Sequence, residues 1–196
     1  MAGKYLHVDI LEPDKETVSA VSCVIKAGGT VIYPSDTVYG IIADSGNRAA
    51  CQAVAAIKGY SSVRPFIVLV PDIESALTLV STSGSVVLMR KYWPGPVTMV
   101  FKASRIVPDW LVSPGGTVAL RQPADKLSQA ILKETGRFLV TTSANRKAEP
   151  FPLTVESIHA EITLKTDITL DGGSLQSRRP SRILNCTGSI PVELRN

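Results

Sequence analysis

The chain has 196 residues, of which 44% are hydrophobic and 19% are charged. This length and apolar content favour one domain, residues 1–196, with a sizeable core, and they exclude a globally disordered chain. The formal net charge of +4 is a mild basic excess. It permits an anionic partner such as a nucleotide or an RNA without requiring one.

Apolar residues recur with helical and strand spacing in turn along the chain. Asp14 opens a helix that Gly28 and Gly29 stop, and a strand follows at residues 30–33. The remaining expected elements, in chain order, are a helix at 48–58, a strand at 66–70, helices at 71–80 and 86–92, strands at 97–101 and 117–120, a helix at 125–134, a strand at 138–141, a helix at 154–160, and strands at 168–170, 183–185 and 192–194. This alternation predicts an α/β fold with a twisted, largely central mixed sheet and flanking helices.

Cysteine usage and apolar run lengths indicate the compartment. Cys23, Cys51 and Cys186 lie far apart with no CxxC spacing, which argues against a disulfide framework or a zinc site. The first residues carry no apolar signal region, and no run approaches the ~18–20 apolar residues of a membrane span. We therefore expect a cytoplasmic protein that has no membrane partner.

A group of polar residues interrupts the apolar pattern between residues 30 and 42. Pro34 ends the strand because it cannot donate to a central sheet ladder, and Ser35, Asp36 and Thr37 follow it. Side chains that follow a strand in an α/β protein lie where ligand-binding groups are common. The alternative interpretation is a Ser-Asp turn that caps itself.

The usual catalytic motifs are absent from the sequence. It contains no GxSxG, no HExxH, no P-loop GxxxxGK[ST] and no GxGxxG. The two histidines, His7 and His159, are expected in an N-terminal strand and a late helix, away from the polar turns. We therefore expect neither a Ser-His-Asp site nor a metal site.

Hydroxyl, amide and cationic side chains at strand and helix ends remain as candidates. They include Thr37, Lys58, Arg64, Thr117, Arg121, Ser143, Asn145, Ser181 and Arg195. Arg121 ends a buried strand, and burying a guanidinium without a partner costs several kcal/mol. Lys58 alone could equally be a solvated lysine at a helix C-terminus. Together the candidates suit an anionic ligand, bound for positioning and electrostatic catalysis.

Seven short sequence blocks follow one another along the chain: IYPSDTVYGI, IKG, RPFIVLV, KYWPGPVTMVF, TVALRQP, TTSAN and PSRILN. In this order they resemble the YrdC-type threonylcarbamoyl-AMP synthases, from about Gly28 to Arg195. The resemblance implies an α/β fold around an open, positively charged concave cavity. Because the chain stops at Asn196, we expect the short, single-domain form.

The resemblance also implies a reaction. L-threonine, bicarbonate and ATP would give threonylcarbamoyl-adenylate and pyrophosphate, with Mg²⁺ held mainly by the triphosphate. The product would feed modification of the adenosine beside the anticodon, so tRNA or other RNA and other tRNA-modification proteins are expected partners. No covalent enzyme intermediate is needed.

Site roles are carried over from the family position by position. The residues that resemble threonine contacts are Thr37, Arg121, Ser143 and Ser181. The residues at nucleotide positions are Lys58, Tyr60, Arg64, Thr117, Asn145 and Arg195. Lys58 and Arg121 are the expected catalytic residues, since cations would stabilise charge as the threonine N-carboxylate attacks the α-phosphate.

This chain departs from the family pattern at three places. Tyr60 stands where the family usually has the arginine of Lys-x-Arg, and Leu69 stands where many relatives have histidine. Arg146 and Lys147 follow SAN in place of a small Ser-Gly pair. We hypothesise that Arg64, Arg146 or Lys147 supplies the missing cation.

Two other functions fit the same residues. One is a non-catalytic RNA-binding or ribosome-associated relative that keeps the basic cavity. The other is an acyl-adenylating or carbamoylating enzyme for another amino acid.

Overall fold

The computed structural model describes residues 3–81, 86–176 and 179–195. Its strands are β1 Lys4–His7, β2 Val31–Tyr33, β3 Gly40–Asp44, β4 Ile67–Leu69, β5 Val97–Lys102, β6 Thr117–Arg121, β7 Leu139–Ser143, β8 Ile168–Asp171, β9 Arg182–Asn185 and β10 Val192–Arg195. Its α-helices are α1 Lys15–Lys26, α2 Arg48–Ile57, α3 Ile73–Thr78, α4 Val86–Tyr92, α5 Lys126–Thr135 and α6 Ala160–Leu164.

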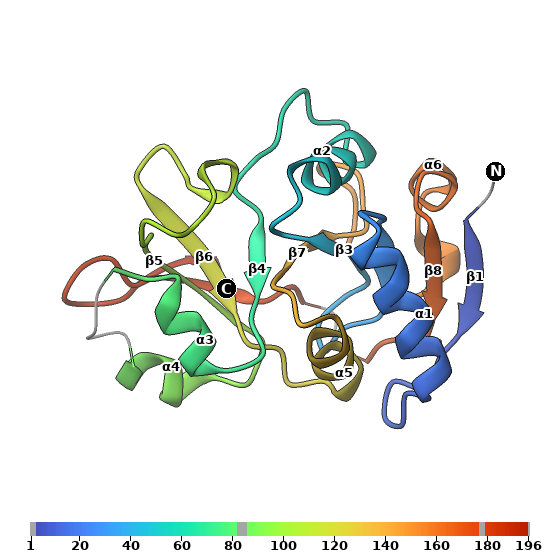
Figure 1. Ribbon diagram of the computed structural model, residues 1–196, viewed down its shortest axis with the longest axis horizontal. Helices are drawn as coiled ribbons and strands as arrows, with labels where there is room; N and C mark the ends of the chain where they lie inside the picture. The colour runs from blue at the N-terminus through green and yellow to red at the C-terminus, as the bar shows by residue number, and fades with distance from the viewer. Residues whose placement is uncertain (1–2, 82–85, 177–178, 196) are drawn as a thin grey trace.

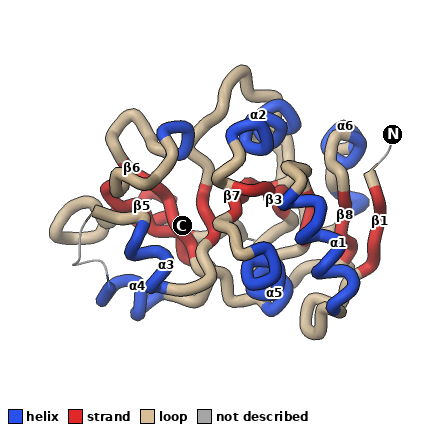
Figure 2. Tube along the Cα trace, viewed as in Figure 1, coloured by secondary structure: helices blue, strands red, loops and turns tan. Residues whose placement is uncertain are grey.

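The strands form one sheet in the order β1-β8-β2-β3-β7-β4-β6-β5-β9-β10. The β2–β8, β4–β6 and β5–β9 pairs are parallel, and the β2–β3, β3–β7 and β5–β6 pairs are antiparallel. Figure 2 shows the strands through the middle of the molecule with helices on both sides. The predicted α/β fold with a large mixed sheet is therefore confirmed.

The two faces of the sheet bury separate apolar clusters, because alternate side chains of a strand point to opposite faces. Val31 and Tyr33 of β2 pack in one cluster with apolar residues of α1 and α5. Ile32, between them, packs in the other cluster with apolar residues of α2 and α6. Figure 1 shows α1 and α5 below the strands and α2 and α6 above them.

Local signals place the helix ends as expected. The Asp14 side chain accepts a hydrogen bond from Thr17 N at the start of α1, and the Asp125 side chain accepts one from Ser128 N at the start of α5. Gly136 ends α5 in the left-handed conformation (φ 61°) that glycine adopts without strain. The N-terminus of α5 lies beside the candidate site described below.

The sheet register brings the ends of several strands together. Gly40 pairs with Tyr33 on one side and with Ser143 on the other, while Arg121 pairs with Leu69. A Cβ on Gly40 would lie 2.9 Å from the Tyr33 ring and 3.2 Å from the Thr142 carbonyl oxygen, so only glycine fits there. Segments far apart in sequence therefore meet at this edge of the sheet.

Two elements differ from expectation. β3 was not predicted as a strand, because its five residues follow directly after the polar turn. The helix expected at 154–160 is wrong: a 3₁₀ turn at Val155–Ser157 is closed by a capping box, Ile158 is extended, and His159 caps the later helix α6. In the described part of the chain, no helix is sufficiently long and apolar to cross a membrane.

We predict that Leu120→Ala lowers the free energy of unfolding by about 2–5 kcal/mol, because it leaves a cavity in the core beneath β6. Leu120 is fully buried, whereas Leu194 on β10 is 60% exposed. The control Leu194→Ala should change the free energy of unfolding by less than about 0.5 kcal/mol. Urea unfolding of both variants measures the difference, and equal losses would contradict the assignment of the core.

Candidate functional site

A cavity of about 220 Å³ opens where the strand ends converge. Its walls come from the turn after β2, the start of β3, the segment before β4, and the ends of β6, β7 and β10. The predicted site residues that line it are Thr37, Tyr60, Arg64, Arg121, Ser143, Ser181 and Arg195. Thr141 and Thr142, which precede Ser143 in the TTSAN block, line it as well, as do Tyr33 and Phe151, which were not predicted.

The charged side chains of this cavity are cationic. Arg64, Arg121 and Arg195 line it, and among the described residues no carboxylate does. Burial lowers the pKa of the Arg195 guanidinium, and the nearby Arg121 charge lowers it further. Two cations held this close favour an anion between them.

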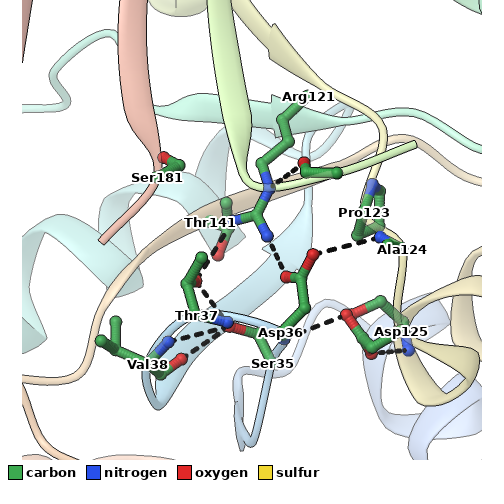
Figure 3. Close-up of polar contacts among 12 residues, drawn as sticks. Ser35, Asp36, Thr37, Val38, Arg121, Pro123, Ala124, Asp125, Thr141 and Ser181 are labelled. Atoms are coloured by element: carbon green, nitrogen blue, oxygen red, sulfur yellow. Dashed lines mark hydrogen bonds and ion pairs between the residues drawn. The ribbon is translucent and has the colours of Figure 1, made fainter. Parts of the chain in front are cut away.

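Arg121 is 4% exposed and is held by three partners (Figure 3). Its Nε donates to the Gly95 carbonyl oxygen at 3.2 Å, and Nη1 donates to Thr37 Oγ1 at 3.3 Å. Its Nη2 forms an ion pair with the Asp36 carboxylate. These contacts fix the guanidinium in the cavity wall and provide the partners that a buried arginine needs.

The turn after β2 is held by Ser35. Its Oγ donates to the Val38 carbonyl oxygen at 2.7 Å and accepts from Thr37 N at 3.1 Å. Ser35 Oγ also lies 2.9 Å from Thr37 Oγ1. The self-capping turn is therefore present, because Ser35 caps the backbone. Thr37 lines the cavity beside Arg121, and its contact with a ligand stays a prediction.

The opposite wall is built from the C-terminal strands. Ser181 Oγ lies 2.8 Å from Thr98 Oγ1 on β5. Arg195 donates from Nε and Nη2 to the Ser181 carbonyl oxygen at 3.0 and 2.7 Å. The two predicted residues Ser181 and Arg195 are thus held against one another.

Lys58 is not among the lining residues of the cavity. It is 7% exposed, so the interpretation as a solvated lysine is wrong. Its Nζ donates to the Ser143 carbonyl oxygen at 2.7 Å, to Asn145 Oδ1 at 3.1 Å and to the Asn145 carbonyl oxygen. Burial lowers the pKa of Lys58 to about 8. Lys58 therefore holds the loop after β7 from the side that faces away from the cavity.

Asn145 and Thr117 also lie outside the cavity wall. Asn145 is buried, with Oδ1 accepting from Ser143 Oγ at 2.6 Å and Nδ2 donating to the Glu149 carbonyl oxygen at 2.7 Å. Thr117 begins β6 and lies 2.7 Å (Oγ1 to Oγ) from Ser113. It is separated from Arg121 by the length of an extended strand, about 13 Å, so the structure does not bring it to the cavity.

The three departures from the family pattern have different surroundings. Arg64 lies over the Tyr60 ring, 4.5 Å from its centroid, and both line the cavity. Arg146 forms an ion pair with Glu161 at 2.5 Å. Of the three hypothesised substitute cations, only Arg64 lines the cavity. Leu69 is buried in the apolar cluster beneath α1 and α5.

Metal-ligand clusters are not found among the described residues. His7 ends β1 beside Asp171, and His159 precedes α6. Both lie outside the cavity. The arrangement offers hydroxyls and guanidiniums, which suits binding and charge stabilisation.

The family model described as telomere recombination, which groups Sua5, YciO and YrdC proteins, matches residues 23–196. The chain belongs to this family. A Nitrosococcus oceani protein named threonylcarbamoyl-AMP synthase is 32% identical over 163 residues, covering 82% of this chain and 88% of that protein. The Bacillus subtilis protein of the same name is 30% identical over 204 residues, covering 100% of this chain and 58% of that protein.

Among solved structures, Pyrococcus abyssi Sua5 complexed with L-threonine is similar with a TM-score of 0.88 and 26% identity. The similarity covers 97% of this chain and 56% of that chain. The chain therefore spans little more than half the length of the Bacillus and Pyrococcus relatives, and most of the Nitrosococcus one.

Asp36 contacts Arg121 beside the cavity and was not among the predicted site residues. It precedes Thr37 in the polar turn, and a buried arginine needs an anionic partner. Those two signals together could have identified it, but the pairing with Arg121 spans 85 residues.

We predict that Lys58 titrates with a midpoint near pH 8 in the folded protein, because burial disfavours its charged form. NMR of its side-chain resonances, assigned by their loss in Lys58→Met, measures the midpoint. Between that pH and the ordinary lysine pKa, the Lys58 side chain is protonated to a greater extent in the unfolded chain than in the folded protein. The free energy of unfolding relative to Lys58→Met should therefore rise with pH in this interval. A midpoint above about 10, the ordinary lysine value, would contradict the prediction.

Proposed function

We propose that the chain is a threonylcarbamoyl-AMP synthase that converts L-threonine, bicarbonate and ATP to threonylcarbamoyl-adenylate and pyrophosphate. The observation that carries the proposal is the buried Arg121 guanidinium, which lines a cavity of hydroxyls and cations. Membership of the family supports it, as do the named synthases from Nitrosococcus and Bacillus and the threonine complex of the Pyrococcus relative.

Threonine would bind through its carboxylate to Arg121. A guanidinium has five N–H donors, and the three contacts with Gly95, Thr37 and Asp36 leave donors for a ligand carboxylate. The hydroxyls of Thr37, Ser143 and Ser181 line the same cavity and are donors and acceptors for the polar groups of threonine.

ATP would extend beyond this cavity. The cavity has a volume of about 220 Å³, which is below the roughly 300–1,000 Å³ of sites that enclose most of a drug-sized ligand. Arg64 and Arg195 line the cavity and would neutralise phosphate charge as the threonine N-carboxylate attacks the α-phosphate. Mg²⁺ would accompany ATP on the triphosphate oxygens, since no carboxylate among the described residues lines the cavity.

Lys58 contributes to this site through the loop after β7. Its contacts to the carbonyl oxygens of Ser143 and Asn145 hold the Ser143 hydroxyl at the cavity. Asn145 completes the same network by accepting from Ser143 Oγ. We therefore assign Lys58 and Asn145 a positioning role in this arrangement.

The threonylcarbamoyl group of the product would be transferred to an adenosine of tRNA with release of AMP, so tRNA and other tRNA-modification proteins are the proposed partners, in the cytoplasm. The alternative of a non-catalytic RNA-binding relative is not favoured, because the relatives reported above are named as synthases.

The test is pyrophosphate release that depends on both threonine and bicarbonate. We predict that Arg121→Lys raises the KM for threonine by about 10–100-fold, because a lysine loses charge-assisted hydrogen bonds worth ~1.5–3 kcal/mol. The control Arg137→Lys makes the same change at an exposed arginine outside the cavity and should leave KM unchanged. No pyrophosphate release by the wild type, together with salt-sensitive RNA binding, would favour the binding protein.

We predict that Arg64→Ala raises the KM for ATP by roughly 10-fold with a smaller effect on threonine, because one cation beside the phosphates is lost. Arg146→Ala is the control, since Arg146 pairs with Glu161 outside the cavity. Full activity of Arg64→Ala would remove Arg64 as the substitute cation, and a loss confined to Arg146→Ala would assign the role to Arg146.

A further inference from the structure

Asp36 lies behind Arg121 relative to the cavity. Its carboxylate pairs with Arg121 Nη2, yet Asp36 is absent from the lining of the cavity that Arg121 lines. It lines instead a separate cavity, of about 780 Å³, that also contacts Asp171 and the loop after β8. Figure 3 shows the Asp36 carboxylate between Arg121 and the segment from Pro123 to Asp125.

Asp36 is itself held in place by the start of α5. One carboxylate oxygen accepts from Ala124 N at 3.2 Å, and Asp36 N donates to Asp125 Oδ2 at 3.3 Å. These reciprocal contacts join the turn after β2 to the N-terminus of α5. The side chain of Asp36 is 15% exposed, so little solvent is available to replace them.

Asp36 and Asp125 lie together in this cluster, and Asp36 is the one that pairs with Arg121. Burial raises the pKa of Asp125, and the nearby Asp36 carboxylate raises it further. Asp125 Oδ1 accepts from Ser128 N, and Oδ2 accepts from Asp36 N. Arg121 therefore has Asp36 as its ion-pair partner among the described residues.

We propose that Asp36 is the positioning residue that holds the Arg121 guanidinium with its remaining N–H groups toward the cavity, ready for a ligand carboxylate. This inference rests on the proposed function for the identity of that ligand. A carboxylate in front of the guanidinium would compete with the ligand. A carboxylate behind it orients the guanidinium and leaves the cavity side open.

The alternative, competition with the ligand, predicts the opposite sign. If Asp36 blocked Arg121, removing its charge would tighten the binding of a carboxylate ligand. If Asp36 positions Arg121, removing its charge weakens that binding, because the guanidinium loses its preferred orientation. The sign of the change therefore separates the two.

The first test uses the full chain without ligand. NMR of arginine side chains follows exchange of the Arg121 Nε–H, assigned by its loss in Arg121→Lys. Asp36→Asn should speed this exchange about 10-fold or more, whereas the control Asp72→Asn, at the start of α3, should leave it unchanged. Unchanged exchange in a folded Asp36→Asn protein would overturn the proposal. If Asp36→Asn does not fold, Asp36→Glu replaces it, with faster exchange expected and unchanged exchange overturning the proposal.

The second test is calorimetric binding of L-threonine and, separately, of a non-hydrolysable ATP analogue. Asp36→Asn should raise the Kd for threonine about 10-fold and leave the Kd for the analogue within about twofold. Equal or tighter threonine binding would overturn the positioning role. Absence of threonine binding to the wild type would instead count against the proposed function, and the exchange measurement then decides the role of Asp36 by itself.

Discussion

The buried guanidinium of Arg121 is the interaction on which the rest of the site depends. A charge this far from solvent is tolerated only with partners, and these come from two other segments: Gly95 before β5, and Asp36 with Thr37 in the turn after β2. The turn after β2, the loop before β5 and the end of β6 must therefore all be in place together. The fold and the candidate site are stabilised by the same contacts.

Much of the fold could be predicted from the sequence because its signals are local. Asp14 and Asp125 accept hydrogen bonds from the first turns of α1 and α5, and Gly136 ends α5. The strand β3 was missed because it follows a turn that carries no glycine or asparagine hairpin signal. Ser35 makes that turn through side-chain contacts, and these depend on the turn having formed.

The site could be predicted only in part, since side-chain direction depends on contacts between distant segments. The lining residues at the ends of β6 and β7 follow from strand boundaries. The direction of Lys58 does not, because it is set by carbonyl oxygens 85 and 87 residues away. Thr117 shows the converse: it shares a strand with Arg121, and the extended geometry of that strand keeps the two apart.

Tyr60 shows how the cavity can keep a cation without the family's usual arginine at that position. The Tyr60 ring lies 4.5 Å from the Arg64 guanidinium, and both side chains line the cavity. A cation–π contact at an exposed site contributes about 0.5–1 kcal/mol, which is a modest restraint on the exposed Arg64 side chain. In the proposed function, residue 64 supplies the positive charge in place of residue 60, and Arg64 has fewer restraining contacts than the buried Arg121. A charge held in this way suits phosphate oxygens at the open side of the cavity, where position matters less than sign.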